Sequence, residues 1–364
     1  MATIRTAAIT RIGSLKNQDP AKQGKIEVLD LPDIETAPEA VRIKVAYCAI
    51  CGSDPHMLEG GYFQGNPVEP GTVVENPRGM GHEISGIIVE LGSKATHRGL
   101  KVGDRVAANF VHFCGDCDFC LSGNKNFCTN SREYSRPGMA EFVTWHEQQV
   151  HVLPDSISLK EGSLLEPTAI CVRMVDKLAP KMGQSVLVCG GGPIGLLSLQ
   201  LLNMYGATNL TMIEPIAERR ELAKTLGAVH VIDPINENTE ERAKEITKGK
   251  GYDCILDASG AMSMMTTLLK IAKRGATVIY GAMYPLSYDM PLNLATYLYS
   301  RELTISGVCI APYTFPRAVE CLPRMNLKPF VECVFPLEQA HEAMVMNMTG
   351  KYPKVLVQCN PSME

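Results

Sequence analysis

The chain has 364 residues, more than one hydrophobic core usually organises, so two domains are expected. Hydrophobic residues make up 45% and charged residues 20%, which is typical of a soluble globular protein, and no stretch approaches the length of a membrane span. The net charge of −4 and the lack of a dense Lys/Arg tract argue against a nucleic-acid or other polyanionic partner.

The N-terminus carries Arg5 and no long apolar core, so we do not expect it to be a secretory signal. Thirteen cysteines in such a chain indicate a reducing compartment, where thiols serve as metal ligands or as small core residues. A cytoplasmic protein without a membrane partner is therefore expected.

The first 157 residues are predicted to be rich in β-structure. Val41, Ile43 and Val45 alternate with charged residues, the period of a half-buried strand. A second strand is predicted over 84–89. The segment 60–80 between them is rich in glycine and proline and predicts a long loop, which could shape substrate choice or form a subunit contact.

A candidate catalytic metal site lies at the edges of these two strands. Cys51 and His82 are a thiolate and an imidazole, both good zinc ligands, and Glu83 adds a carboxylate, with Glu166 as a second candidate. Two or three firm ligands with an open position are typical of a catalytic zinc, which lowers the pKa of a bound alcohol. Singly, each residue has another interpretation: His82 could be a surface histidine, and the nearby Cys48 a core residue.

A run of four cysteines follows, in the segment 112–130. The spacing favours a closed structural zinc site of four thiolates, since short loops between ligands lower the entropy of gathering them. A disulfide pair or four unrelated core thiols are the alternatives, and the pattern lacks the two distant knuckles of a zinc ribbon. A closed site does no chemistry. The four residues are Cys114, Cys117, Cys120 and Cys128.

From Ser185 the pattern changes to strands and helices in strict alternation, which predicts a parallel, doubly wound sheet. After Leu303 the chain becomes β-rich and irregular again. We therefore expect a dinucleotide-binding domain over 158–303, inserted between two parts of a catalytic domain, 1–157 and 304–364. The predicted strands are 185–189, 210–213, 229–232, 254–256 and 276–280, and the predicted helices are 194–205, 217–226 and 240–247.

The sequence Gly190–Gly195 fits the Gly-x-Gly-x-x-Gly motif after an apolar strand and before a helix. We expect Gly190 to make the turn, Gly192 to let the backbone approach a pyrophosphate, and Gly195 to allow helix–sheet packing. Pro193 and Ile194 begin a helix whose free N–H groups suit phosphate. The alternative is a glycine turn that binds nothing.

Glu214 stands at the end of the next predicted strand. A carboxylate there can accept hydrogen bonds from both ribose hydroxyls of the adenosine and repels a 2′-phosphate, which favours NAD over NADP. Arg219 and Arg220 weaken this preference, because a nearby arginine can hold a 2′-phosphate.

These motifs occur together in the order found in the zinc-dependent medium-chain dehydrogenases, and the chain most resembles the sorbitol, 2,3-butanediol and threonine dehydrogenase branch over nearly its whole length. The resemblance implies an α/β protein with a GroES-like, β-rich catalytic domain and a Rossmann domain. It also implies that Cys51, His82 and one glutamate hold the catalytic zinc. Glu83 is the ligand in some members and Glu166 in others.

The resemblance also implies roles for three residues near Cys51. Ser53 would hydrogen-bond the reacting oxygen, and His56 would carry the proton on to solvent. Asp54 would accept a hydrogen bond from the free nitrogen of His82, or act only as a turn cap. Hydride would pass directly from the substrate carbon to the nicotinamide ring.

The chain departs from its relatives at two places. The polar pair that sorbitol dehydrogenases carry after the strand at 305–308 is replaced here by Ile310 and Ala311. Arg173 stands where relatives often have a histidine. It could meet a phosphate or carboxylate, or pair with the cofactor or a glutamate.

We therefore expect a zinc-dependent, NAD-linked enzyme that oxidises a secondary hydroxyl of a polyol, sugar or cyclitol to a ketone. Oxidation of a vicinal diol or of threonine is the enzymatic alternative, and a non-catalytic dinucleotide-binding protein is the alternative from another class. Two zinc ions per subunit and a homodimer or homotetramer are expected from the resemblance.

Overall fold

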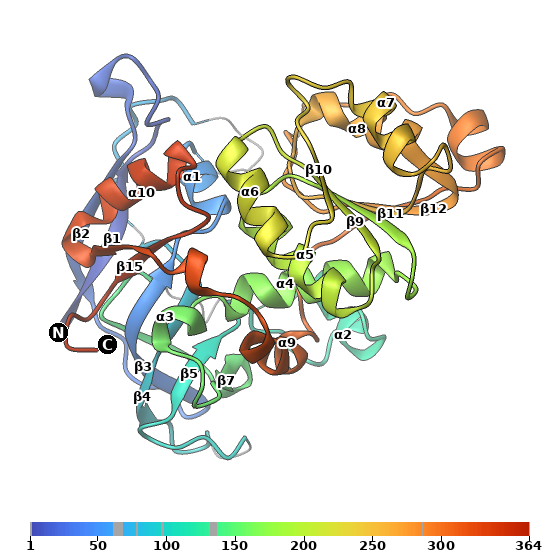
Figure 1. The fold of residues 1–364 in the computed structure, drawn as a ribbon. Coiled ribbons are helices and arrows are strands. Elements are labelled where there is room, and N and C mark those ends of the chain that lie inside the picture. The colour runs from blue at the N-terminus through green and yellow to red at the C-terminus, as the bar shows by residue number, and fades with distance from the viewer. Residues whose placement is uncertain are drawn as a thin grey trace. The chain divides into compact units, whose positions relative to one another are not determined.

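The computed structural model describes residues 2–60, 68–77, 79–95, 98–131, 137–285 and 287–363. The chain forms two compact units, one made of Met1–Glu166 with Ala318–Glu364 and the other of Pro167–Arg317 (Figure 1). Both ends of the chain therefore belong to the first unit. The expected loop at 60–80 is described only in part, because residues 61–67 and 78 lie outside the described ranges.

The first unit is built mainly from antiparallel strands and short helices. Its strands and helices are β1 (Thr3–Arg11), β2 (Lys25–Pro32), β3 (Ala40–Ala49), α1 (Ser53–Leu58), β4 (Glu83–Leu91), β5 (Arg105–Ala108), α2 (Asp118–Leu121), β6 (Phe142–His146), β7 (Val150–Val152), α3 (Leu159–Gly162), β14 (Cys333–Pro336), α10 (Ala340–Thr349) and β15 (Val355–Gln358). Single 3₁₀ turns cover Pro20–Lys22, Lys125–Phe127, Glu147–Gln149, Leu322–Arg324, Lys328–Phe330 and Leu337–Gln339.

The main sheet of this unit is organised around β3. Within the described ranges its strand order is β14-β15-β3-β4-β5-β7, and β6 also pairs with β3. Val41, Ile43 and Val45 are fully buried while the residues between them are partly exposed, which confirms the predicted strand. From Ala46 to Ala49 every residue is buried, so the strand enters the core before it reaches Cys51.

The second unit alternates strands and helices. Its elements are β8 (Ser185–Cys189), α5 (Pro193–Met204), β9 (Asn209–Ile213), α6 (Ala217–Thr225), β10 (His230–Ile232), α7 (Thr239–Ile246), β11 (Tyr252–Asp257), α8 (Met262–Ile271), β12 (Ala272–Tyr280), a π-helical segment at Ala295–Tyr299 and β13 (Thr304–Gly307). Each boundary of this unit falls within a helix: its first residues belong to α4 (Leu165–Leu178) and its last residues to α9 (Phe315–Cys321).

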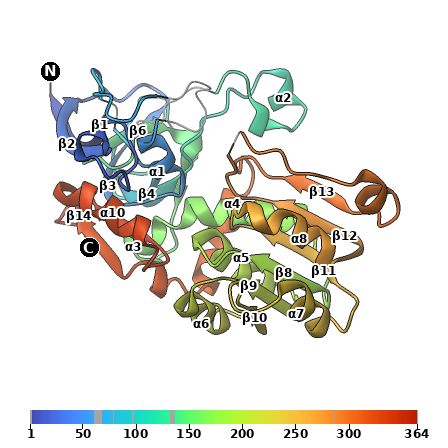
Figure 2. The same ribbon diagram turned by 90° about the horizontal axis from the view of Figure 1, so that it is seen from above.

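The strands of the second unit form a parallel sheet in the order β10-β9-β8-β11-β12-β13 (Figure 2). The chain runs outward from β8 to β10 and then returns to β11 on the other side of β8. The strand order therefore reverses between β8 and β11, and a crevice at the carboxyl ends of these strands is where open α/β sheets bind ligands. The predicted doubly wound sheet is confirmed.

The unit boundaries differ from those expected at 157/158 and 303/304. Thr304–Gly307 forms β13, which is hydrogen-bonded in parallel to β12, so this segment continues the second unit's sheet. At the other boundary, α3 packs against β3, β4 and β5, and the Ser85 hydroxyl donates to the Leu159 carbonyl oxygen, so residues up to Glu166 stay with the first unit.

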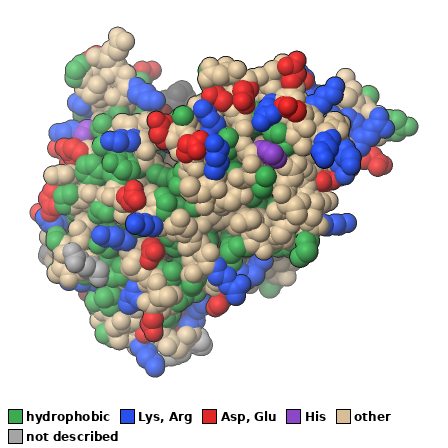
Figure 3. Space-filling view, in the orientation of Figure 1, with side chains coloured by type: hydrophobic (Ala, Val, Ile, Leu, Met, Phe, Trp, Pro, Cys, Tyr) green, Lys and Arg blue, Asp and Glu red, His purple; other side chains and the backbone are tan. Residues whose placement is uncertain are grey.

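Among the helices in the described ranges, none combines the length and apolar character that crossing a membrane requires. Figure 3 shows acidic and basic side chains mixed on the visible faces of both units.

Candidate functional site

The four cysteines of the segment 112–130 lie together in the first unit. Their sulfur atoms all lie within 4.8 Å of one another. Cys114 Sγ is 3.5 Å from Cys128 Sγ and 3.8 Å from Cys120 Sγ. A tetrahedron with metal–sulfur bonds of about 2.3 Å has sulfur–sulfur distances of about 3.8 Å, whereas a disulfide needs about 2.05 Å. The geometry therefore fits a four-thiolate metal site and not a disulfide pair.

The local backbone explains how so short a segment gathers four thiols. Gly115 and Gly123 have φ angles of 83° and 80°, a left-handed conformation that lets the chain fold back. Backbone N–H groups, that of Thr129 first, lower the pKa of Cys117 to about 6, which favours the thiolate form that binds metal.

A second group of possible ligands lies where β3 ends and β4 begins. The two strands are antiparallel and pair Ala49 with Glu83, so Cys51, two residues past Ala49, comes next to the start of β4 although thirty residues separate the motifs in the sequence. The ligand atoms of Cys51, His82 and Glu83 all lie within 4.8 Å of one another. This cluster combines thiol, imidazole and carboxylate donors.

The His82 imidazole is strongly affected by the charged groups close to it. Burial alone would lower the pKa of His82, but the Cys51 thiolate first, and then Asp54 and Glu166, raise it well above its usual value. The His82 ring also packs against Phe110, with a centroid distance of 4.6 Å. The imidazole therefore packs against an aromatic ring and also lies close to anionic groups.

Glu166, the other candidate carboxylate, opens α4 and is only 5% exposed. Its pKa is raised to about 7, mainly by burial and also by Glu83 and Asp54, against the lowering effects of His82 and Lys354. It feels the charges of the cluster, but the group of ligand atoms within 4.8 Å in the described ranges contains Glu83 and not Glu166.

Sequence reasoning missed Lys354, which lies just before β15. Its Nζ donates to Glu83 Oε1 at 2.7 Å and lies 2.6 Å from Oε2. The two side chains are 2% and 1% exposed. Burial would lower the pKa of Lys354, but Glu83, Cys51 and Glu166 raise it, so the ammonium form is retained. A lone lysine before an apolar strand offers no sequence signal of this contact.

Asp54 occupies a different place from the one predicted. Its Oδ2 accepts the backbone N–H of Cys51 at 2.8 Å, and its buried Oδ1 has no hydrogen-bond partner in the described ranges. The hydrogen bond expected from His82 is not formed, whereas the turn-cap interpretation agrees with the structure. Ser53 and His56 lie three residues apart in α1, on one face of the helix, and both are partly exposed.

In the second unit, the glycine motif follows β8 at the switch point of the sheet. Gly190 has a φ of 99°, and a Cβ there would lie 2.7 Å from the backbone of Ser259. A Cβ on Gly195 would lie 1.8 Å from the Gly190 carbonyl oxygen. At Gly192, the N-cap of α5, a Cβ would meet nothing within 4 Å. Two glycines therefore serve chain packing, and the third faces open space at a helix N-terminus.

Glu214 follows β9 and is 4% exposed. Its Oε2 accepts the Gly191 N–H at 2.6 Å and its Oε1 accepts the Ile216 N–H at 2.9 Å, so the carboxylate lies against the glycine loop. Arg220 donates to the Glu214 carbonyl oxygen at 2.7 Å and pairs with Asp233 at 2.8 Å. Arg219 stands in the first turn of α6.

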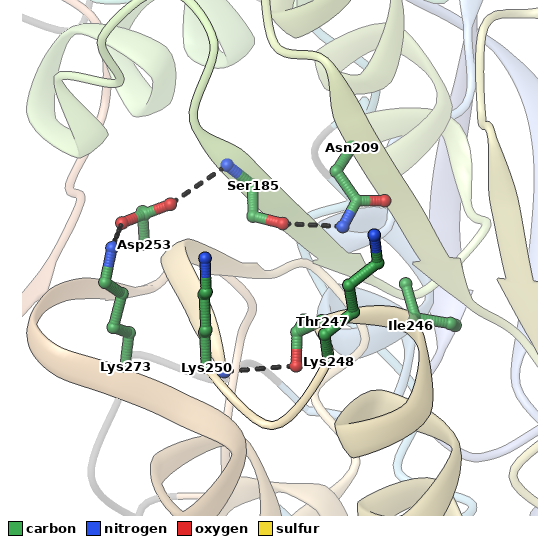
Figure 4. A pocket seen from close by; sticks show the side chains of 9 residues that line it. Ser185, Asn209, Ile246, Thr247, Lys248, Lys250, Asp253 and Lys273 are labelled. Carbon is green, nitrogen blue, oxygen red and sulfur yellow. Dashed lines mark hydrogen bonds and ion pairs between the residues drawn. The ribbon is translucent and has the colours of Figure 1, made fainter.

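A cavity of about 190 Å³ lies at the amino ends of the strands of this sheet, opposite to the carboxyl ends that the glycine motif follows (Figure 4). It is lined by Ser185, Asn209 and Asp253, which stand at or near the starts of their strands, and by Lys248 and Lys250. Because the glycine loop follows a strand end, this cavity is separate from the dinucleotide motif.

Comparisons with known proteins match both parts of the chain. The model of the alcohol dehydrogenase GroES-like domain matches residues 37–155, and that of the zinc-binding dehydrogenase matches residues 193–324. D-arabitol-phosphate dehydrogenase of Enterococcus avium is 34% identical over 343 residues, 92% of this chain and 94% of that protein. Sorbitol dehydrogenase of Bacillus subtilis is 31% identical, with 92% and 94% covered.

Comparison with solved structures supports the same fold. A zinc-binding dehydrogenase from Sinorhizobium meliloti 1021, solved bound to NADP, is 28% identical with a TM-score of 0.83, and 98% of this chain and 100% of that one are covered. The predicted GroES-like and Rossmann fold classes are confirmed.

Proposed function

The chain belongs to the zinc-dependent alcohol dehydrogenase family, whose members act on CH–OH groups, and we propose that it oxidises a secondary hydroxyl of a polyol, sugar or cyclitol reversibly to a ketone, with NAD⁺ as hydride acceptor. The observation that carries this proposal is the mixed cluster of Cys51, His82 and Glu83, whose ligand atoms lie within 4.8 Å of one another. A four-thiolate lobe alone does no chemistry, but a mixed cluster with three ligands is typical of a catalytic metal.

Zinc fits this cluster, because it prefers thiolate, imidazole and carboxylate donors at tetrahedral spacing. Glu83 Oε2 makes no hydrogen bond in the described ranges but lies 2.6 Å from the Lys354 ammonium group, so a bound cation would share this oxygen with Lys354. We assign Cys51, His82 and Glu83 as the ligands, with Glu166 as the alternative carboxylate. When bound there, zinc supplies a Lewis acid that lowers the pKa of the substrate hydroxyl.

The proton of the substrate hydroxyl would pass through α1. We assign to the Ser53 hydroxyl a hydrogen bond with the reacting oxygen, and to His56, on the same face of α1, the transfer of the proton towards solvent. Asp54 positions the start of this helix by holding the Cys51 N–H.

NAD⁺ as the hydride acceptor is supported by the second unit. Gly192, Pro193 and Ile194 present backbone at the start of α5, where a pyrophosphate is favoured. The Glu214 carboxylate lies against the glycine loop, and it would accept the ribose hydroxyls and repel a 2′-phosphate. The relative solved bound to NADP and the position of Arg219 favour NADP⁺ instead. The two cofactors therefore have to be compared directly.

The substrate class is inferred from relatives whose names specify D-arabitol phosphate and sorbitol. Both are acyclic polyol structures with adjacent secondary hydroxyls. We also propose a cytoplasmic homodimer or homotetramer. No disulfide joins any of the thirteen cysteines, all of which lie in the described ranges, and this supports a reducing compartment.

The test is reduction of NAD⁺ and of NADP⁺ by the zinc-loaded protein with polyols, polyol phosphates, aldoses, inositols, vicinal diols and threonine. One responding polyol group with NAD⁺ would support the proposal, and a response with NADP⁺ alone would contradict the role of Glu214. Cys51→Ser should remove one zinc per chain and all turnover. Cys309→Ser, at an exposed free cysteine, is the matched control and should change neither. Turnover in the Cys51 variant would refute the assigned site.

A further inference from the structure

The cavity at the amino ends of the second unit's strands is bounded by several separate segments of the chain (Figure 4). Ser185 and Asn209 begin β8 and β9, and Asp253 stands near the start of β11. The loop after α7 supplies Lys248 and Lys250. The volume of about 190 Å³ lies below the roughly 300–1,000 Å³ of sites for drug-sized molecules, so the cavity suits a small ion or metabolite.

The charged side chains that line this cavity are mostly basic. Three of them are lysines, Lys248, Lys250 and Lys273, and one is the acidic Asp253. The carboxylate is already engaged, because Oδ1 lies 2.7 Å from Lys273 Nζ and Oδ2 accepts the Ser185 N–H at 3.1 Å. The ammonium groups of Lys248 and Lys250 form no ion pair or hydrogen bond with any described residue. Two uncompensated cations in a concave surface attract an anion.

Hydrogen bonds hold the loop from which both lysines extend. The Thr247 hydroxyl donates to the Ala243 carbonyl oxygen at 2.7 Å and accepts the Gly251 N–H at 3.0 Å. The Lys250 N–H donates to the Thr247 carbonyl oxygen at 3.1 Å. The backbone is therefore ordered before a ligand arrives, and binding has to order the two lysine side chains and little else.

Lys248 has a backbone conformation that glycine adopts more easily. Its φ is 52°, in the left-handed region, and it directly follows Thr247, the C-cap of α7. Glycine is the usual residue at this position of a helix end, and any other residue pays a steric cost there. Stability alone therefore favours glycine, so the lysine at this position indicates a role for its side chain.

We propose that this cavity binds a small phosphate-bearing anion, with Lys248 and Lys250 as the residues that supply its positive charge. Three lysines against one aspartate leave two positive charges in excess, and a phosphate monoester carries about −1.5 to −2 at pH 7. The Ser185 hydroxyl accepts from Asn209 Nδ2 at 2.7 Å, so its own proton is available to a phosphate oxygen. The site is separate from the dinucleotide motif and does not depend on the proposed function.

The test is a calorimetric titration of the full chain with inorganic phosphate and with methyl phosphate, which has no hydroxyl to oxidise. The ionic strength is held constant, and each titration is repeated with NAD⁺ present. Saturable binding of either probe, one per chain and unaffected by NAD⁺, would support the proposal, and the tighter probe shows whether the ligand is the free ion or an ester. Loss of binding when NAD⁺ is added would place the anion at the glycine motif and overturn the proposal.

Three lysine variants locate the anion. Lys250→Met and Lys248→Gly should each raise the dissociation constant of the bound probe by about tenfold. Lys244→Met removes the same charge from the exposed face of α7, outside the cavity, and should change the constant by less than about twofold. Equal weakening by Lys244→Met would show a general effect of surface charge and overturn the proposal, as would unchanged binding in both cavity variants.

Lys248→Gly also separates lost binding from misfolding. It relieves the left-handed conformation of a lysine, so in phosphate-free buffer its unfolding midpoint in denaturant should rise while phosphate binding weakens. Phosphate should raise the midpoint of the native protein, because a ligand that binds the folded state stabilises it, and should raise that of Lys248→Gly much less. An equal rise in the two proteins would contradict the assigned site.

Discussion

Replacing Gly192 with alanine tests the dinucleotide site without disturbing the fold. A Cβ at this position meets nothing within 4 Å, and the backbone angles, φ −75° and ψ −178°, are open to any residue. Alanine is a poorer N-cap than glycine, but it removes about 0.4–1 kcal/mol of unfolded-chain entropy, so the two effects nearly cancel. The free energy of unfolding should therefore change by less than about 1 kcal/mol.

Binding of the cofactor should respond much more strongly. The added methyl group stands where the pyrophosphate is proposed to touch the backbone, and overpacking of this kind costs about 1–3 kcal/mol, roughly 5- to 150-fold in the dissociation constant. Calorimetric titration with NAD⁺ measures the binding change, and denaturant unfolding of the free protein measures stability.

Gly195→Ala is the contrasting variant. Its Cβ would lie 1.8 Å from the Gly190 carbonyl oxygen, so it must displace the loop. It should therefore lose stability as well as NAD⁺ binding. If Gly192→Ala binds NAD⁺ as tightly as the native protein, the pyrophosphate does not approach this loop and the assigned cofactor site is wrong.

Three further predictions follow from single side chains. Cys117→Ser should remove the lobe zinc, leave the other zinc in place and open the lobe to proteolysis; retention of both zinc ions by metal analysis would refute this. Burial and the charge of Arg98 hold the pKa of His151 at about 4, against an ordinary value of 6.5. The unfolded chain therefore binds a proton that the native state rejects, and about 3 kcal/mol of stability should be lost as the pH falls from about 6.5 to about 4. Denaturant unfolding should show this loss relative to a His151→Gln variant, and equal pH profiles would contradict it. Glu214→Ser with Arg219 retained should shift the NADP⁺ to NAD⁺ ratio of kcat/KM upward by about tenfold or more, and an unchanged ratio would refute the role of Glu214.

The sequence predicted the second unit well because its signals are local. Each buried parallel strand is a short apolar run, and each helix follows within a few residues, so 185–189 and 210–213 were placed to within a residue of β8 and β9. The chain after Leu303 was less predictable. Thr304–Gly307 resembles any short strand, and only its pairing with β12 shows to which unit it belongs.

The residues of the candidate site also include some that the sequence predicts and one that it does not. Cys51, His82 and Glu83 could be grouped from the sequence because each type binds zinc and each stands at a strand end. The contact between Glu83 and Lys354 spans 271 positions and depends on the strand order of the sheet, so no spacing rule reveals it. Asp54 shows the converse, since the local turn that the sequence allowed is formed and the longer-range hydrogen bond is not.

The two metal clusters differ in what removing the metal should do, because they are assembled from different kinds of structure. The four-cysteine lobe has little besides its ligands to hold it: α2 has four residues, and most of the segment is exposed. Its folding and its metal binding are therefore one process. The Cys51 cluster is held by three paired strands, with a lysine already supplying positive charge to its carboxylate. This cluster should therefore keep its shape when zinc is removed, and circular dichroism of the zinc-free protein should show the β-structure of the first unit retained.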